Sequence, residues 1–147
     1  MNRGNVRWKM PIVALLAMVG LALVGTQLRR NGRKGCALDG AAIEPFYRVR
    51  IVTADGKSQE FCCILCAELW LAKQQTTPLS ILVTDEASGE EIDRARATFV
   101  RSKLVTNAAT GNRVHVFAGN ADGLRHALLF AGKILTPEEC PFQGSAP

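Results

Sequence analysis

A pattern of strand, helix and strand occurs twice in this chain, at residues 48–83 and 113–136. In each copy a phenylalanine, Phe61 or Phe117, comes just before the start of the helix. One copy alone would bury too little apolar surface to be stable, so we expect the two copies to share a core or to pack tightly. The repeat therefore predicts an α+β fold made of two small ββαβ-like units.

The first unit begins with a predicted hairpin. Alternating apolar residues flank Asp55 and Gly56, and an Asp-Gly pair tolerates the positive φ of a tight turn. Apolar residues at helical spacing follow between residues 64 and 73, and residues 78–85 have the pattern of a short strand. The polar residues 86–97 are typical of a turn and loop, or of a short helix.

The second unit repeats this order. Residues 98–105 and 112–119 are strand-like, and residues 133–136 predict a closing strand. We expect the tail, residues 138–147, to be loose.

Between these strands, residues 120–132 predict a helix, with Asn120 as its N-cap and Gly132 as its stop. Three apolar residues of this helix share one face: Leu124, Leu128 and Ala131.

Residues 10–28 are apolar throughout and carry no charge, and they are about as long as a helix that crosses a bilayer. No clean small-residue cleavage pattern follows them. We therefore interpret residues 1–35 as an uncleaved membrane anchor and basic linker. Residues 36–95 then form the first unit with the cysteine site, and residues 96–147 form the second unit and the tail.

The positive charge of the chain belongs to the flanks of the apolar segment. Residues 1–35 hold seven of the 18 basic residues and no acidic one, which leaves 11 basic against 13 acidic residues in the rest. A nucleic-acid binder would carry its basic excess on the folded part, so this class is excluded. The flanking charges are nearly balanced and favour a cytoplasmic domain only slightly.

Three of the five cysteines, Cys62, Cys63 and Cys66, fall within five positions at the start of a predicted helix. Burial in the core explains one of the adjacent pair but not three thiols so close together. Cys63 and Cys66 form a C-x-x-C pair, which is also typical of redox chemistry. A metal site is the interpretation that we favour, with Cys36 as a further ligand from the preceding loop, because thiolates select soft ions such as Cu(I) and zinc.

Adjacent residues of an extended chain point to opposite faces, so only one of Cys62 and Cys63 is expected to face Cys36. Spacing alone leaves both possible as the partner of Cys66. We favour Cys63, because we expect the helix to begin at Cys62 or Cys63. Cys140 lies in the tail and is expected to be dispensable for metal binding.

Cys36, a hairpin and then Phe-Cys-Cys-x-x-Cys resemble the TRASH family of heavy-metal-binding domains. These domains use a C-x-x-C knuckle, and here Asp39 stands where the second knuckle cysteine would be. The resemblance implies a site made of Cys36, Asp39 and the cysteines at the helix start. Three thiolates without a fourth suit Cu(I) better than a structural zinc site, which needs four ligands.

Residues 36–137 as a whole resemble NosL-type proteins, through the Asp-Gly-Lys hairpin, the cysteine at the helix start and the Val-Thr-Asp…Ser-Gly segment. NosL-type proteins are membrane-associated copper-binding accessory factors for nitrous-oxide reductase, built from two small ββαβ units. The resemblance implies a Cu(I) metallochaperone with an acceptor metalloprotein and a periplasmic, extracytoplasmic domain. Such a protein must release its metal, so we expect an exposed site with few ligands.

The sequence contains no Ser-His-Asp order, phosphate loop or paired acid site, so we expect a binding protein and not an enzyme. His115 and His126 are expected to be surface or hydrogen-bonded core residues and not ligands. Two alternatives remain. One is a membrane-tethered thiol oxidoreductase that uses Cys63 and Cys66. The other is an interaction module in which a zinc ion stabilises the small fold.

Overall fold

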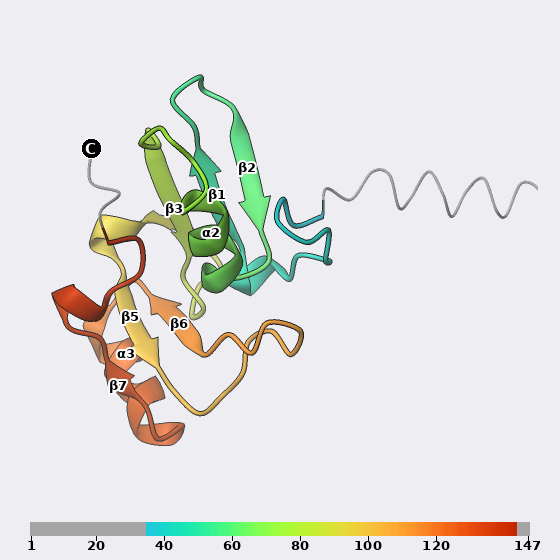
Figure 1. Ribbon diagram of the computed structural model, residues 1–147. Coiled ribbons are helices and arrows are strands. Elements are labelled where there is room, and N and C mark those ends of the chain that lie inside the picture. The colour runs from blue at the N-terminus through green and yellow to red at the C-terminus, as the bar shows by residue number, and fades with distance from the viewer. Residues whose placement is uncertain (1–34, 144–147) are drawn as a thin grey trace, which may run out of the picture. The chain divides into compact units, whose positions relative to one another are not determined.

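The computed structural model describes residues 35–143, which form two antiparallel sheets with one helix packed on each (Figure 1). In the first sheet the strands lie in the order β2-β1-β3-β4, and in the second in the order β6-β5-β7. The predicted α+β class with two ββαβ repeats is confirmed, with β4 as an additional strand in the first repeat.

The first unit contains β1 (Val49–Val52), β2 (Ser58–Phe61), α2 (Ile64–Leu71), β3 (Ser80–Thr84) and β4 (Glu91–Asp93). The second contains β5 (Thr98–Arg101), β6 (Val114–Phe117), α3 (Asn120–Leu129) and β7 (Lys133–Ile134). The anchor predicted at residues 10–28 lies outside the described residues. Within residues 35–143, no helix has both the length and the apolar character that a membrane crossing requires.

The hairpin of β1 and β2 turns at Asp55 and Gly56, as predicted. Gly56 has a φ of 79°, which a side chain would disfavour, and the Thr53 N–H donates to Lys57 O across the turn at 2.9 Å. The hairpin register pairs Val49 with Phe61, so the strand ends with a fully buried phenylalanine directly before the cysteines.

Strand β4 corrects part of the expectation for residues 86–97, where a turn and a short helix occur as predicted but residues 91–93 form a strand. It pairs with β3, and Glu91 binds Arg50 of β1 through two hydrogen bonds, of 3.0 Å to Nε and 2.5 Å to Nη2. A one-turn 3-10 helix, η2 (Arg94–Arg96), follows the strand. Charged side chains are common on edge strands, where they prevent pairing with other molecules. They also remove the alternation of apolar and polar residues from which a strand is predicted.

Helix α3 packs on the second sheet through its smallest residues. Gly123 and Ala127 are buried, whereas Leu124 and Leu128 of the predicted apolar face are exposed. The N-cap is Gly119, so the helix begins one residue earlier than the predicted cap Asn120 implies.

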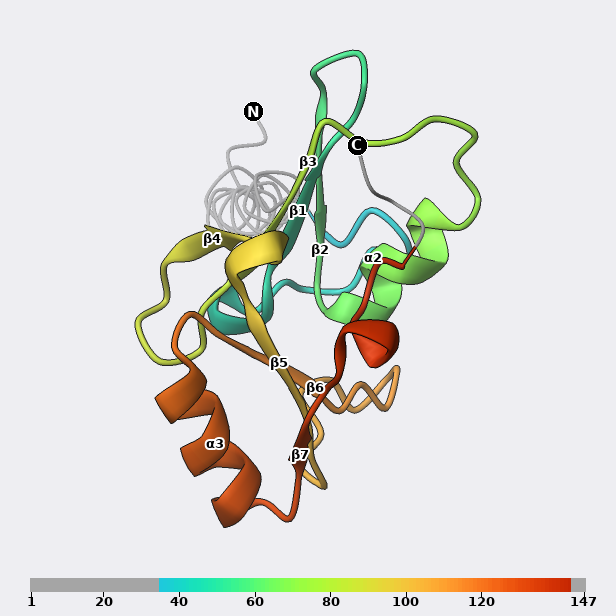
Figure 2. The same cartoon turned by 90° about the vertical axis from the view of Figure 1, so that its left-hand side faces the viewer.

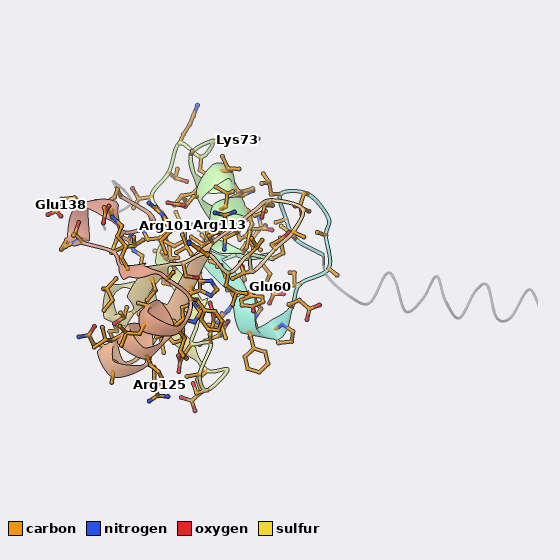
Figure 3. All side chains as sticks on the ribbon, turned by 90° about the horizontal axis from the view of Figure 1, so that it is seen from below. Glu60, Lys73, Arg101, Arg113, Arg125 and Glu138 are labelled. Atoms are coloured by element: carbon orange, nitrogen blue, oxygen red, sulfur yellow. The ribbon has the colours of Figure 1, made fainter. Side chains whose placement is uncertain are left out.

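The two units share one core, as the repeat predicted. Apolar residues of the first unit, among them Phe61 and Ile64, belong to the same buried cluster as Phe99 and Val116 of the second unit. Figure 2 shows the sheet of β1–β3 above the sheet of β5–β7, and the two are joined where the Glu86 N–H, just after β3, donates to Val116 O of β6 at 2.9 Å. Charged side chains such as Lys73, Arg125 and Glu138 project from the surface (Figure 3).

The tail is not loose over its described part, which corrects our expectation. A 3-10 helix, η3 (Pro137–Glu139), leads to Phe142, which is buried in the shared core. The Phe142 N–H donates to Glu68 Oε1 on α2 at 3.0 Å, so Phe142 is held against the first unit.

Candidate metal centre

The loop before β1 brings Cys36 and Asp39 together. The Cys36 N–H donates to Ala41 O and the Gly40 N–H donates to Cys36 O, both at 2.8 Å, and Gly40 has a φ of 73° that closes the turn. The Ala37 N–H donates to Glu60 O of β2 at 2.8 Å, which fixes the loop beside the strand that leads to the cysteines. The predicted knuckle is therefore a tight turn, with Asp39 in place of the second cysteine.

The start of α2 supplies the other thiols. Helix α2 begins at Ile64, and its N-cap Cys63 has extended backbone with φ −167° and ψ 168°. The extended segment therefore includes Cys62 and ends at Cys63, and Cys66 lies in the first turn of the helix, four residues after Cys62.

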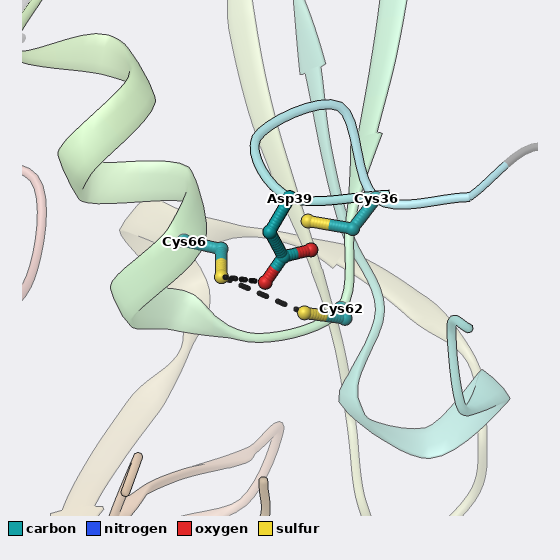
Figure 4. A group of neighbouring side chains, drawn as sticks. All are labelled: Cys36, Asp39, Cys62 and Cys66. Atoms are coloured by element: carbon teal, nitrogen blue, oxygen red, sulfur yellow. Dashed lines mark hydrogen bonds between the residues drawn. The ribbon is translucent and has the colours of Figure 1, made fainter. Parts of the chain in front are cut away.

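Cys36, Asp39, Cys62 and Cys66 each offer one donor atom, and these four atoms lie within 4.8 Å of one another (Figure 4). The Cys62 thiol donates to Cys66 Sγ at 3.6 Å, and the Cys66 thiol donates to Asp39 Oδ2 at 3.5 Å. The three cysteines are buried to 3% exposure or less, and only Asp39 is exposed. The expectation of an exposed site thus holds for the carboxylate and is wrong for the thiols.

These separations suit a single bound ion. Two sulfurs that are each about 2.3 Å from one metal ion lie about 3.8 Å apart in a tetrahedral site and about 4.0 Å apart in a trigonal one. The Cys62 and Cys66 sulfurs are 3.6 Å apart, so one ion could bind both with little movement. Three sulfurs and one carboxylate oxygen form a donor set that fits soft or borderline metal ions.

Burial keeps the Cys62 and Cys66 thiols protonated when no metal is bound. It raises the pKa of the Cys62 thiol to about 12, and it also raises the pKa of the Cys66 thiol, which the neighbouring Cys62 and Cys63 raise further. The pKa of the Asp39 carboxyl is lowered by the hydrogen bond from the Ala41 N–H and by those from the Cys36 and Cys66 thiols. The metal-free site is therefore a chain of neutral thiols that ends on an ionised carboxylate.

Cys62 and not Cys63 joins Cys36, which corrects our preference. As predicted, only one of the adjacent pair enters the group, but the helix begins later than we expected, so the spacing to Cys66 is four residues. The Cys63 thiol contacts Thr110 Oγ1 of the second unit at 3.5 Å.

Asn107 is a neighbour of the site that the sequence analysis missed. Its Nδ2 donates to Cys62 Sγ at 3.2 Å from a loop 45 positions further along the chain. The polar residues around it are ordinary for a loop, and no motif marks them.

The remaining candidates lie outside the group. His115 is fully buried, with Nδ1 2.9 Å from Glu86 Oε2 and Nε2 3.1 Å from Leu104 O, and His126 Nε2 lies 3.2 Å from Ser102 Oγ. Both histidines are thus hydrogen-bonded within the protein, as expected.

No protein-family model and no curated protein sequence matches the chain. Among solved structures, the chain is similar to the crystal structure of the copper chaperone NosL from Shewanella denitrificans, with a TM-score of 0.62 and 20% sequence identity. The match covers 74% of this chain and 90% of that one.

The chain has a NosL-like fold. The resemblance drawn from the sequence is thereby confirmed at the level of the fold, and a cysteine cluster that could hold a metal ion accompanies it. At 20% identity the NosL-like fold does not by itself say which metal is bound or where it is delivered.

Proposed function

We propose that this protein is a Cu(I)-binding metallochaperone that holds its metal at Cys36, Cys62 and Cys66. The observation that carries the proposal is the meeting of three buried sulfurs and the Asp39 carboxylate within 4.8 Å. The NosL-like fold supports it, because the neighbour of known structure is a copper chaperone.

The donor set favours Cu(I) over zinc. Cu(I) is a soft ion that thiolates select, and three sulfurs are enough to surround it. Structural zinc is almost always held by four ligands in a closed tetrahedron, and here the fourth donor would be the exposed Asp39. Zinc is therefore the alternative ion.

Asp39 marks the side of the site from which a metal can leave. It is the one exposed member of the group, and it lies on a loop before the first strand. An acceptor metalloprotein with its own soft ligands would approach this side and exchange thiolates with the ion one by one. Such transfer requires no catalysis, so the protein acts as a carrier and not as an enzyme.

The proposal also includes a membrane anchor and an acceptor protein for the metal. Residues 10–28 would anchor the chain in a membrane, with the metal-binding domain on the extracytoplasmic, periplasmic side. Nitrous-oxide reductase is the proposed acceptor. Both points are supported by the sequence resemblance to NosL-type proteins.

A competition titration tests the metal site. The full chain, reduced and kept without oxygen, is titrated with Cu(I) against a coloured Cu(I) chelator of known affinity. We expect one Cu(I) ion per chain, and we expect Cys36→Ser, Cys62→Ser and Cys66→Ser each to abolish tight binding.

Cys63→Ser and Cys140→Ser are the matched controls, because both remove a thiol of the same chain outside the group. They should bind Cu(I) as the native protein does. Unchanged affinity after Cys66→Ser, or lost affinity after Cys140→Ser, would show that the site has been placed wrongly.

The thiol oxidoreductase hypothesis is less well supported. It needs a thiol that ionises easily, whereas burial raises the pKa of Cys66. Catalytic reduction of a model disulfide by the reduced protein would support the thiol oxidoreductase hypothesis.

A further inference from the structure

A loop of the second unit reaches the metal site of the first. It joins β5 to β6, and two of its polar side chains contact the adjacent cysteines. Asn107 Nδ2 donates to Cys62 Sγ at 3.2 Å, and Thr110 Oγ1 lies 3.5 Å from Cys63 Sγ. Only the first of these contacts touches a member of the donor group.

The loop fixes the direction in which the Asn107 amide points. Its Oδ1 accepts the N–H groups of Ala109 at 2.9 Å and of Thr110 at 3.3 Å, and its backbone oxygen accepts the Gly111 N–H at 2.8 Å. Because Asn107 Oδ1 accepts hydrogen bonds within the loop, Asn107 Nδ2 points toward Cys62 Sγ.

Asn112 fastens this loop to the rest of the second unit. It is buried, it bridges to Asn107, and its Nδ2 donates to Thr106 Oγ1 at 2.6 Å and to Val114 O at 3.1 Å. The donor that faces Cys62 is therefore held by the fold and does not depend on a free rotamer.

A hydrogen bond to a ligand sulfur matters most when the sulfur is charged. A thiolate that binds a metal keeps lone pairs, and a hydrogen bond to an ionised acceptor is roughly twice as strong as a neutral one. A donor in this place orients the ligand and stabilises its negative charge, as groups around a metal site commonly do.

We propose that Asn107 is a positioning residue of the metal site, which holds Cys62 through its amide N–H and so makes the second unit part of the binding centre. The inference rests on the proposed Cu(I) site. It assigns to the loop a role in affinity beyond the packing of the two units.

Replacement of the donor tests the inference in the full chain, with Cu(I) as the metal and the same chelator competition. Asn107→Ser keeps a short acceptor for the loop but cannot reach Cys62, and it should weaken Cu(I) binding about 10- to 100-fold. Thr110→Val is the matched control. It removes the loop contact to Cys63 and the 3.4 Å contact from the Asn112 N–H, but it keeps the hydrogen bond from Asn107 to Cys62, so it should leave the affinity unchanged.

The effect must pass through Cys62. In a Cys62→Ser background only weak Cu(I) binding by Cys36 and Cys66 remains, and a competing chelator of lower affinity measures it. There Asn107→Ser should cause less than about a twofold further loss, since the effects of partners in contact are not additive. An equal loss in both backgrounds would overturn the inference, because a merely structural role of the loop predicts that result.

A second measurement needs no variant. The side-chain amide protons of Asn107, followed by NMR in the native chain, should shift downfield when Cu(I) is added, because the sulfur becomes a stronger acceptor. Native Cu(I) binding without this shift, together with unchanged affinity of Asn107→Ser, overturns the inference and leaves the proposed function standing. A native chain that binds no Cu(I) overturns both.

Discussion

Among single residues, we expect Asp39 to govern which ion the group prefers. Its carboxylate is the one oxygen donor among three sulfurs, and the Cys66 thiol already donates to it. Carboxylate oxygen suits zinc, whereas Cu(I) has little affinity for it. Selectivity between the two ions should therefore depend on this position.

We predict that Asp39→Ala weakens zinc binding by at least about tenfold and changes Cu(I) affinity by less than about threefold, because only zinc uses the oxygen. Competition titrations with one chelator for each metal measure both values. Asp55→Ala is a suitable control, since that carboxylate lies in the hairpin turn and outside the group. Equal losses for both metals would show that the Asp39 carboxylate also binds Cu(I).

Cu(I) binding should strengthen as the pH rises. Burial raises the pKa of Cys62 to about 12, so the thiol is protonated in the metal-free protein at neutral pH and must lose its proton to bind. For each thiol that does so, apparent affinity should increase about tenfold per pH unit between pH 6 and 8. Chelator competition at several pH values measures the slope, and a flat profile would mean that the thiols are already ionised.

The sequence predicted most of the candidate metal group but favoured Cys63 over Cys62. Cys36, Asp39 and Cys66 were all candidates, and the structure brings them together. The choice between Cys62 and Cys63 depended on whether α2 begins at residue 62, 63 or 64, and helix starts cannot be placed from sequence with that precision. Asn107 could not be found at all, because its role arises only when a distant loop folds back.

Among the elements, α3 shows how closely a helix can approach its sheet. A Cβ atom built on Gly123 would lie 2.8 Å from Thr98 Cγ2 and 3.3 Å from Val100 Cγ2 of β5. Glycine costs about 1 kcal/mol of helix propensity relative to alanine, so the close contact must be worth more than this.

We predict that Gly123→Ala destabilises the protein by about 1–3 kcal/mol, since added atoms in a packed layer force neighbours to move. Combining it with Thr98→Ser, which removes the methyl group at 2.8 Å, should recover most of the loss. Denaturant unfolding of the two single variants and the double variant measures this. A stabilising Gly123→Ala would show that α3 is free to shift away from the sheet.

Element type was easier to predict than element boundaries. The hairpin, both helices and the strands β3, β5 and β6 follow from periodicity and from Asp55-Gly56. Strand β4 was missed because its sequence, Glu91–Asp93, is mostly charged, and it is a strand only because β3 offers an open edge. The secondary structure of such segments depends on pairing with a neighbouring strand, and the local sequence pattern does not indicate that pairing.

At the scale of the whole molecule, the core is common to both units and the tail completes it. Phe142 is 3% exposed and packs in the same cluster as Phe61 and Val116. Its backbone N–H also binds Glu68 on α2. Phe142 thus packs in the same buried cluster as the three cysteines of the candidate metal group.

We predict that Phe142→Ala costs about 3–5 kcal/mol and lowers the stability of both units together, because the side chain leaves a cavity in their shared core. Thermal unfolding should remain one cooperative transition at a lower midpoint. Gln143→Ala, which changes the exposed next residue, is the control and should have little effect. Two separate transitions would show that the units are independent.

The overall architecture could be predicted because it follows from the sequence repeat. The packing of the tail could not be predicted, since it occurs only once in the chain. Nothing in the polar, proline-containing end of the sequence distinguishes a loose segment from one that inserts a single phenylalanine. Whether Phe142 inserts into the core depends on the space between the two units, and that space exists only in the folded chain.

The shared core also has an evolutionary consequence. In both copies the strand ends in phenylalanine and the helix begins three residues later, but Cys62 and Cys63 of the first copy correspond to Ala118 and Gly119 of the second. Side chains of the second copy complete the buried core of the first, so a substitution that disrupts the second copy also disrupts the cysteine-bearing one, and we expect the two copies to evolve under one constraint.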